Sequence, residues 1–277
     1  MIARPKDAAT VMLIRESHHL DEGGLEVLMV LRHPESMFVP SCYVYPGGCL
    51  DEDDCSPEMA SLCTGIDRDT ARRLINNISP PEAALGAWVA GIRETFEEVG
   101  LLLAYERDGS LVSLDSEERI ERFSAYRWAL CEGKIDLKDM LRKEELTLAA
   151  DRLHYFSHWI TPELLPLRYD VRFFVAEVPD NQKALHDRVE LTGHVWISPQ
   201  KALDEYEQGK FDMVLPTIMT LADLCKYKTV DDVIRSTCEE KDIPAILTKM
   251  VELDDRLVEV MPDGEVFTAR PPEYPEG

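Results

Sequence analysis

Apolar residues recur along this chain with two different periods, which predict a mixture of strands and helices. Short runs rich in Val, Leu, Ile, Phe and Tyr predict β-strands, and apolar residues three and four positions apart predict helices. The predicted strands are residues 10–14, 25–31, 43–45, 154–160, 171–178 and 195–197, with a turn at residues 21–24 and a hairpin near residues 261–264. The predicted helices are residues 67–78, 82–99, 116–131, 137–150, 198–208, 216–225 and 230–239. This order, without repeats or a low-complexity linker, predicts an α/β fold.

The predicted helix at residues 82–99 carries an unusual set of charges in its last turns. Glu94, Glu97 and Glu98 are spaced i, i+3 and i+4, so their carboxylates share one helix face. Like charges at this spacing destabilise a bare helix, so we expect a cation to compensate them. A hard divalent ion such as Mg²⁺ prefers oxygen ligands and suits this cluster. Arg93 is close enough in sequence to orient or partly neutralise it.

A glycine pair, Gly47 and Gly48, precedes this helix in the sequence Tyr-Pro-Gly-Gly. Glycines allow backbone carbonyls and amides to come close to a metal ion or a phosphate. A Glu-x-x-Glu-Glu run alone is most often solvated surface. In combination with Arg93, Gly100 and the glycine pair, the run favours a metal-dependent phosphate site.

These residues resemble the Nudix hydrolase signature, Gly-x5-Glu-x7-Arg-Glu-U-x-Glu-Glu-x-Gly-U, in which U is a bulky aliphatic residue. The second half matches from Arg93 to Leu101, with Thr95 in place of one aliphatic residue. The first half matches at the glycine pair, with Asp54 in the place of the first glutamate, counted from Gly48. However, 44 residues separate Gly48 from Arg93, against 13 in the signature. An insertion between a loop and a helix costs little closure entropy, so we expect the fold to accommodate it.

Some Nudix proteins carry an insertion at this place, notably the branch containing the peroxisomal coenzyme A diphosphatases of animals and their bacterial relatives. Further stretches that resemble this branch are residues 90–98, 158–162 and 168–174. The resemblance implies a Nudix-type α/β/α sandwich with a mixed sheet and additional helical insertions. We expect one Nudix domain over residues 8–225, with helical insertions at about residues 55–83 and 105–150. Residues 226–277 are expected to form a helical and hairpin extension packed on the same domain.

The resemblance also implies which residues form the active site. Mg²⁺ or Mn²⁺ would be bound by Glu94, Glu97 and Glu98, with a backbone carbonyl of Gly47 or Gly48 completing the set. The ions would neutralise the diphosphate oxygens and help to deprotonate a water that attacks phosphorus. Arg93 is the remaining candidate catalytic residue of the signature.

Two candidate residues lie outside the signature. Glu190, just before the strand at residues 195–197, is a candidate base, and ordinary loop surface is its alternative interpretation. Arg32 is a candidate substrate-binding residue together with the two glycines. An ungapped comparison with the upstream motif of coenzyme A diphosphatases from another Nudix branch places Arg32 on an arginine and Met37 where a second arginine belongs. That arginine would supply a bidentate phosphate contact, so the coenzyme A assignment depends on the long-insert branch alone.

The net charge and the lengths of the apolar stretches limit the kinds of partner that this protein binds. The balance of 30 basic and 53 acidic residues gives a net charge of −23, which opposes binding to nucleic acid through its phosphates. No apolar stretch approaches the roughly 18 residues of a membrane span.

The seven cysteines form no Cys-x2-Cys pair and suit a reducing compartment. The first ten residues lack an apolar signal-peptide segment, and the last four lack a Ser-Lys-Leu type of address, so we expect a cytoplasmic protein. The sequence gives no indication of the oligomeric state.

Three functions follow as hypotheses. The leading one is Mg²⁺- or Mn²⁺-dependent hydrolysis of coenzyme A or acyl-coenzyme A to 4′-phosphopantetheine products and adenosine 3′,5′-bisphosphate. The second is the same chemistry on another small nucleoside diphosphate derivative, such as NADH, ADP-ribose or a nucleotide sugar. The third is a non-catalytic nucleotide-ligand sensor, although such a domain has no need of three crowded carboxylates.

Overall fold

The computed structural model describes residues 2–17, 24–185, 190–238, 242–253 and 256–267. Its main sheet consists of β1 (Lys6–Glu16), β2 (Leu25–Arg32), β3 (Tyr43–Val44), β4 (Gly47–Cys49), β8 (His154–Ile160), β9 (Tyr169–Glu177), β10 (Leu191–Ile197) and β11 (Ile246–Leu247). These eight strands follow the order β10-β2-β1-β9-β8-β11, with β3 paired to β2 and β4 paired to β1. The pairs β1–β9 and β8–β11 are parallel and the others antiparallel, so the sheet is mixed.

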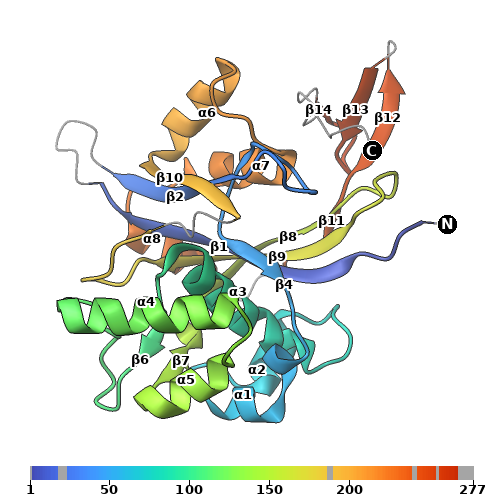
Figure 1. The fold of residues 1–277 in the computed structure, drawn as a ribbon. Coiled ribbons are helices and arrows are strands. Elements are labelled where there is room, and N and C mark those ends of the chain that lie inside the picture. The colour runs from blue at the N-terminus through green and yellow to red at the C-terminus, as the bar shows by residue number, and fades with distance from the viewer. Residues whose placement is uncertain (1, 18–23, 186–189, 239–241, 254–255, 268–277) are drawn as a thin grey trace.

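Helices cover both faces of this sheet, as Figure 1 shows. They are α1 (Pro57–Ser61), α2 (Arg68–Leu74), α3 (Ala83–Val99), α4 (Glu117–Cys131), α5 (Leu137–Glu144), α6 (Pro199–Glu207), α7 (Leu215–Leu224) and α8 (Val230–Thr237). Val11 and Leu13 of β1 face the core formed with α1 to α5, whereas Met12 and Ile14 face the core formed with α6 to α8. This alternation along a strand builds the predicted α/β/α sandwich.

Helix α3 follows the predicted range closely, and small residues let it approach the sheet. At Gly91, a Cβ atom would lie 3.1 Å from side-chain atoms of both Leu153 and Val11. The helix ends at Gly100, whose left-handed φ of 72° lets its N–H donate to the Phe96 carbonyl at 2.9 Å. This packing fixes the last turns of α3 beside β4.

The helix predicted at residues 67–78 is shorter in the structure. It begins after Asp67, which caps α2 through its side chain, and ends at Leu74. Ile75 leaves the helical backbone region with φ −118° and ψ 87°. Ile75 and Ile78 are buried in the core, so tertiary packing of an extended connection overrides local helical propensity.

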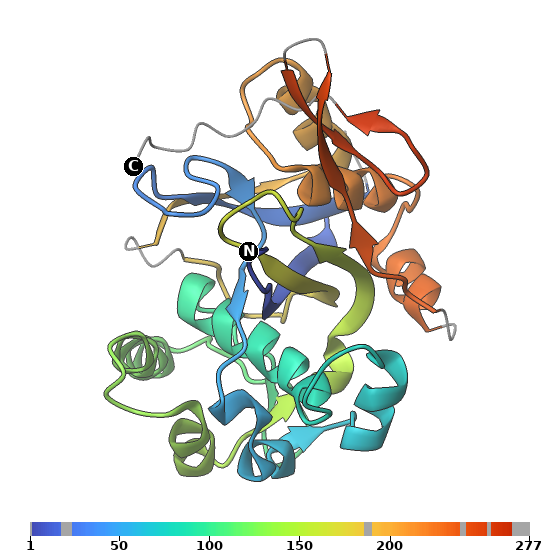
Figure 2. The same cartoon turned by 90° about the vertical axis from the view of Figure 1, so that its right-hand side faces the viewer.

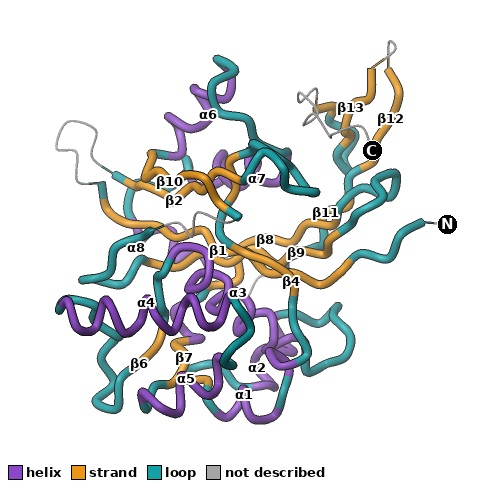
Figure 3. Tube along the Cα trace, viewed as in Figure 1, coloured by secondary structure: helices purple, strands orange, loops and turns teal. Residues whose placement is uncertain are grey.

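The helix predicted at residues 137–150 is wrong over its second half. Helix α5 ends before Glu145, which adopts a left-handed φ of 59°. The chain then forms β7 (Thr147–Ala149), which pairs with β5 (Cys63–Thr64) and β6 (Ala104–Tyr105) in a small sheet. A 3-10 turn, η2 (Ala150–Arg152), follows. Figure 3 shows this small sheet beneath the main sheet, among helices α1 to α5.

The C-terminal part adds strands to the sandwich. Strand β11 pairs with β8 at one edge of the main sheet. Beyond it, β12 (Lys249–Leu253), β13 (Arg256–Val260) and β14 (Val266–Phe267) form a separate antiparallel sheet, visible in Figures 1 and 2. The β13–β14 connection confirms the predicted hairpin near residues 261–264, while residues 21–23 of the other predicted turn lie outside the described residues. Within the described ranges, no helix is long and apolar enough to cross a membrane.

Candidate active site

The glycine loop lies directly against β1. The Thr10 hydroxyl donates a hydrogen bond to the Pro46 carbonyl at 2.7 Å. A Cβ atom on Gly47 would lie 2.4 Å from the Ala9 carbonyl oxygen, so a side chain does not fit at this position. The tight approach brings β4, and with it Gly48, over the last turns of α3.

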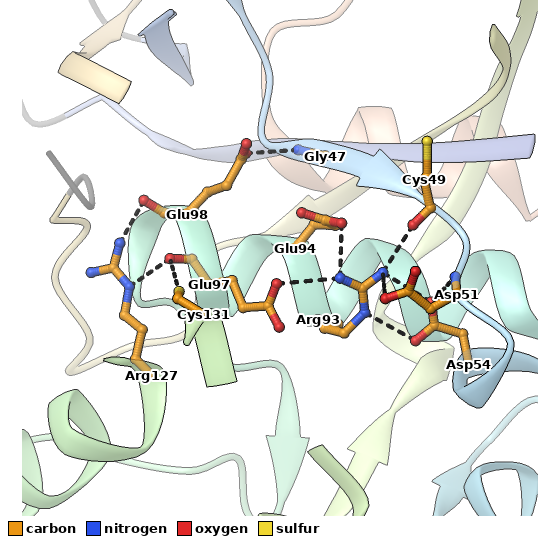
Figure 4. Close-up of polar contacts among 10 residues, drawn as sticks. All are labelled: Gly47, Cys49, Asp51, Asp54, Arg93, Glu94, Glu97, Glu98, Arg127 and Cys131. Atoms are coloured by element: carbon orange, nitrogen blue, oxygen red, sulfur yellow. Dashed lines mark hydrogen bonds and ion pairs between the residues drawn. The ribbon is translucent and has the colours of Figure 1, made fainter. Parts of the chain in front are cut away.

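Each glycine meets one carboxylate of α3, as Figure 4 shows for the Gly47–Glu98 pair. The Gly47 N–H donates to Glu98 Oε2 at 2.9 Å. A Cβ atom on Gly48 would lie only 2.3 Å from Glu94 Oε1. The glycine pair therefore gives two carboxylates room to lie against the backbone of β4.

Arg93 connects the glycine strand, the acidic turn that follows it and α3 (Figure 4). Its Nε and Nη2 donate to the two carboxylate oxygens of Asp54 at 3.0 and 2.9 Å, and Nη2 also donates to the Cys49 carbonyl at 2.9 Å. Its Nη1 donates to Glu94 at 2.8 Å and to Glu97 at 3.2 Å. Asp54 thus joins the cluster from the turn η1 (Asp53–Cys55), although the long insertion separates it from Arg93 in sequence.

Burial opposes the ionisation of the carboxyls in this cluster. It raises the pKa of Glu94 to about 7, with a further contribution from the neighbouring Glu97 and opposition from Arg93. Burial, followed by the charge of Glu94, raises the pKa of Glu98 well above its usual range. Burial also raises the pKa of Glu97, against the effect of Arg93. One guanidinium therefore leaves the carboxylates incompletely compensated, which favours an added cation.

The donor set suits a hard divalent ion in its chemistry, since Glu94 and Glu97 both line the cavity beside Gly48 and offer oxygen atoms. In the part of the chain that the structure describes, no three His, Cys, Asp or Glu side chains are already gathered as a metal site. Figure 4 shows why: Glu98 points to Gly47, while Glu97 turns toward Arg93. For all three glutamates to bind one ion, Glu97 would have to turn away from Arg93. Arg93 would then keep its bonds to Asp54.

Arg32 and Glu190 lie near the same carboxylates. Both residues line the cavity, and β10 brings them together because Leu191 pairs with Arg32. Arg32 lowers and Glu190 raises the pKa of Glu98, although burial and Glu94 have larger effects. Arg32 Nε is buried and lacks a hydrogen-bond partner among the described residues. The structure thus brings all the sequence-predicted site residues to one region.

The cavity has a volume of about 500 Å³ and a mainly apolar lining. Aromatic and aliphatic side chains on its walls include Phe38, Trp159, Leu165, Tyr169, Phe173 and Met213. The C-terminal segment contributes Thr248, Met250, Leu257, Glu259 and Phe267. Sequence reasoning missed this last group, because the hairpin signal near residues 261–264 does not say which surface the hairpin faces.

Comparisons with known proteins agree with this arrangement. A family model described as the NUDT19 Nudix domain matches residues 5–224. Acyl-coenzyme A diphosphatase NUDT19 from Xenopus laevis is 24% identical over 279 residues, covering 89% of this chain and 72% of that protein. The Gallus gallus protein of the same name is 24% identical over 310 residues, covering 96% and 80%. The crystal structure of a Nudix hydrolase from Alicyclobacillus acidocaldarius has a TM-score of 0.67 at 24% identity, covering 85% of this chain and 97% of that one.

The fold and the extent of the family match define this protein as a Nudix hydrolase, which confirms the predicted superfamily and enzyme class. Within that superfamily, the chain belongs to the NUDT19 Nudix domain family.

Proposed function

We propose that this enzyme hydrolyses the phosphoanhydride bond of coenzyme A or acyl-coenzyme A with the help of Mg²⁺ or Mn²⁺. One observation carries the choice of substrate: Glu94 and Glu97 open into a large cavity whose walls are mainly apolar. An apolar wall suits a pantetheine or acyl arm better than the hydroxyl-rich arm of ADP-ribose or a nucleotide sugar. The names of the two NUDT19 relatives support the same choice.

The carboxylates of Glu94, Glu97 and Glu98, with the Gly48 carbonyl, would hold the metal. When bound, a divalent ion neutralises diphosphate oxygens and acidifies a water ligand. Arg93 would keep the cluster in place through its paired bonds to Asp54 and its bond to the Cys49 carbonyl. Because Asp54 and the Cys49 carbonyl hold Arg93, Glu94 and Glu97 could replace their bonds to Arg93 with bonds to a cation.

Arg32 and Glu190 complete the proposed chemistry. Arg32 lines the cavity, and its guanidinium, whose Nε lacks a partner among the described residues, would donate to a diphosphate oxygen, assisted by the backbone of Gly47 and Gly48. Glu190 is exposed and lines the cavity, so its carboxylate would take a proton from the attacking water.

We also propose that residues 8–225 are the catalytic domain, with insertions at residues 55–83 and 105–150, and that residues 226–277 pack on it. The pairing of β11 with β8 of the main sheet supports the packing of this C-terminal segment on the domain. All seven cysteines are free thiols, which supports a location in the cytoplasm. Fractionation of cells that produce the full chain would test the location.

A substrate panel tests the function. The purified enzyme is incubated with Mg²⁺ or Mn²⁺ and coenzyme A, acyl-coenzyme A, NADH, ADP-ribose or nucleotide sugars, and products are identified by mass. Preferred release of adenosine 3′,5′-bisphosphate from a coenzyme A species is the expected result. Preference for another substrate would keep the chemistry and overturn the coenzyme A assignment.

A further inference from the structure

The C-terminal sheet shares a cavity with the catalytic carboxylates. Strand register places Met250 opposite Glu259, and Glu259 opposite Phe267, so these three side chains form one row on the same face of the sheet. All three line the cavity that Glu94 and Glu97 also line. Figures 1 and 2 show the sheet beyond β11, on a different side of the molecule from the helices around α3. The cavity therefore extends from the carboxylates to the β12–β14 sheet.

This distal wall has a distinctive chemistry. Met250, Leu257 and Phe267 offer apolar surface, and Leu257 remains 43% exposed although it belongs to the cavity lining. Trp159 and Leu165 add further apolar surface to the same cavity. A flexible hydrocarbon chain placed against these side chains would be removed from water, which stabilises binding in proportion to the apolar area buried.

One carboxyl interrupts this apolar wall. Glu259 is half-buried, and its side chain is hydrogen-bonded to the Thr248 hydroxyl. Burial raises the pKa of Glu259, against the effect of the Thr248 bond. A carboxyl in this position accepts a hydrogen bond from an N–H group and disfavours a nearby phosphate. The wall thus suits an arm that contains amides and hydrocarbon but no further phosphate.

We infer that the β12–β14 sheet determines specificity by binding the amide-containing and acyl part of the substrate, with Glu259 accepting an amide hydrogen and Leu257 covering the hydrocarbon. This inference rests on the proposed coenzyme A hydrolase function. It assigns a role to a segment that lies outside residues 5–224, the part that matches the family model. Specificity would then come from an element that other chains with the same catalytic domain need not carry.

The opposite face of the same sheet supplies a matched control. Leu253 is 49% exposed, close to the 43% of Leu257, and pairs with Arg256 at the end of β12 and β13. It alternates with the cavity-facing row and is not part of the cavity lining. Leu257→Ser and Leu253→Ser therefore make the same chemical change at similar exposure on opposite faces.

The direct test is binding of octanoyl-pantetheine, which has the amides and acyl chain but no diphosphate, measured by calorimetry. We expect Leu257→Ser to weaken binding about tenfold and Glu259→Gln to weaken it about fivefold, with Leu253→Ser unchanged. Absence of binding to the wild-type enzyme, or equal affinity in all variants, would overturn the inference. Because this probe contains no phosphoanhydride, the result is independent of catalysis.

Kinetics then separate the inference from the proposed function. With octanoyl-coenzyme A, Leu257→Ser should lower kcat/KM about tenfold through KM, while kcat/KM for ADP-ribose stays within about twofold of the wild type. An equal loss on both substrates would indicate damage to the catalytic site and contradict a specificity role. If the wild-type enzyme binds octanoyl-pantetheine but hydrolyses no coenzyme A species, the proposed function is wrong, whereas the assignment of the binding surface is still supported.

Discussion

Arg93 and Asp54 form a bidentate ion pair across an insertion, with two hydrogen bonds of 3.0 and 2.9 Å. The Asp54 side chain is 2% exposed and the Arg93 side chain 11%. The pair joins the acidic turn after the glycine strand to helix α3, so the residues of the candidate site stay together in spite of the insertion. Removing Asp54 would leave the Nε of the buried Arg93 without its hydrogen-bond partner, while Nη1 keeps its contacts with Glu94 and Glu97.

We therefore predict that Asp54→Ala lowers the free energy of unfolding by about 3 kcal/mol, because it breaks a buried pair from one side. The neighbouring Asp53 has a side chain that is 58% exposed and pairs with Lys138 at the surface. Asp53→Ala should cost less than about 1 kcal/mol. Urea denaturation of both variants measures the difference, and equal losses would contradict a special role for the Arg93–Asp54 pair.

The close packing of Gly48 against Glu94 allows a steric test of the proposed metal site. A methyl group there would lie 2.3 Å from Glu94 Oε1, so Gly48→Ala should displace the carboxylate and weaken Mn²⁺ binding at least about tenfold. Gly193→Ala is the control, because the nearest atom to its Cβ would be Leu31 Cβ at an ordinary 3.9 Å. Calorimetric titration with Mn²⁺ compares the two. Unchanged affinity in Gly48→Ala would argue against ligation by Glu94.

The substitution Glu97→Gln tests metal ligation, because it removes the charge of the side chain with little change in its shape. Glu97→Gln should reduce kcat more than about 100-fold, since even outer-shell partners of metal ligands commonly contribute 10–100-fold. The free energy of unfolding should stay within about 1 kcal/mol, because the substitution also relieves repulsion within the carboxylate cluster. Glu121→Gln, on the exposed surface of α4, is the matched control. Full turnover by Glu97→Gln would exclude its assignment as a metal ligand.

The raised pKa of Glu94, about 7, predicts how metal binding depends on pH. Below that pKa the metal-free carboxyl holds a proton that the ion must displace, so affinity should fall as much as about tenfold for each pH unit below 7. In the metal-free protein, this carboxyl contributes stability at low pH, and the contribution is lost as pH rises from 4.5 through about 7.

Thermal denaturation with and without Mg²⁺ checks this dependence. The rise in Tm on adding Mg²⁺ should be larger at about pH 8 than at about pH 6. Glu97→Gln should reduce the rise at both values. A stabilisation by Mg²⁺ that does not vary with pH would show that the ion binds away from the buried carboxylates.

The parts of the fold that depend on local pattern could be predicted from the sequence. The spacing of Glu94, Glu97 and Glu98 fixes their common helix face, and the alternation of apolar residues in β1 fixes its two buried sides. Asp54 could be identified by counting from Gly48, although only the structure shows its contact with Arg93.

The remaining features depend on contacts between distant segments. Leu148 follows a helical pattern but pairs in β7 with residues from two other segments, which no local window reveals. Leu257 and Glu259 enter the cavity because the whole β12–β14 sheet is placed beside it. Likewise, the spacing of the glutamates does not predict that Glu97 turns toward Arg93.

The most direct test of the central claim is hydrolysis of coenzyme A in ¹⁸O-labelled water with Mn²⁺, followed by mass analysis of both products. We expect adenosine 3′,5′-bisphosphate and 4′-phosphopantetheine, with a single ¹⁸O atom on one of the two phosphates and no reaction when the metal is chelated. Either undiminished hydrolysis with the metal chelated, or no hydrolysis of coenzyme A or acyl-coenzyme A with any divalent ion, would contradict the proposed function.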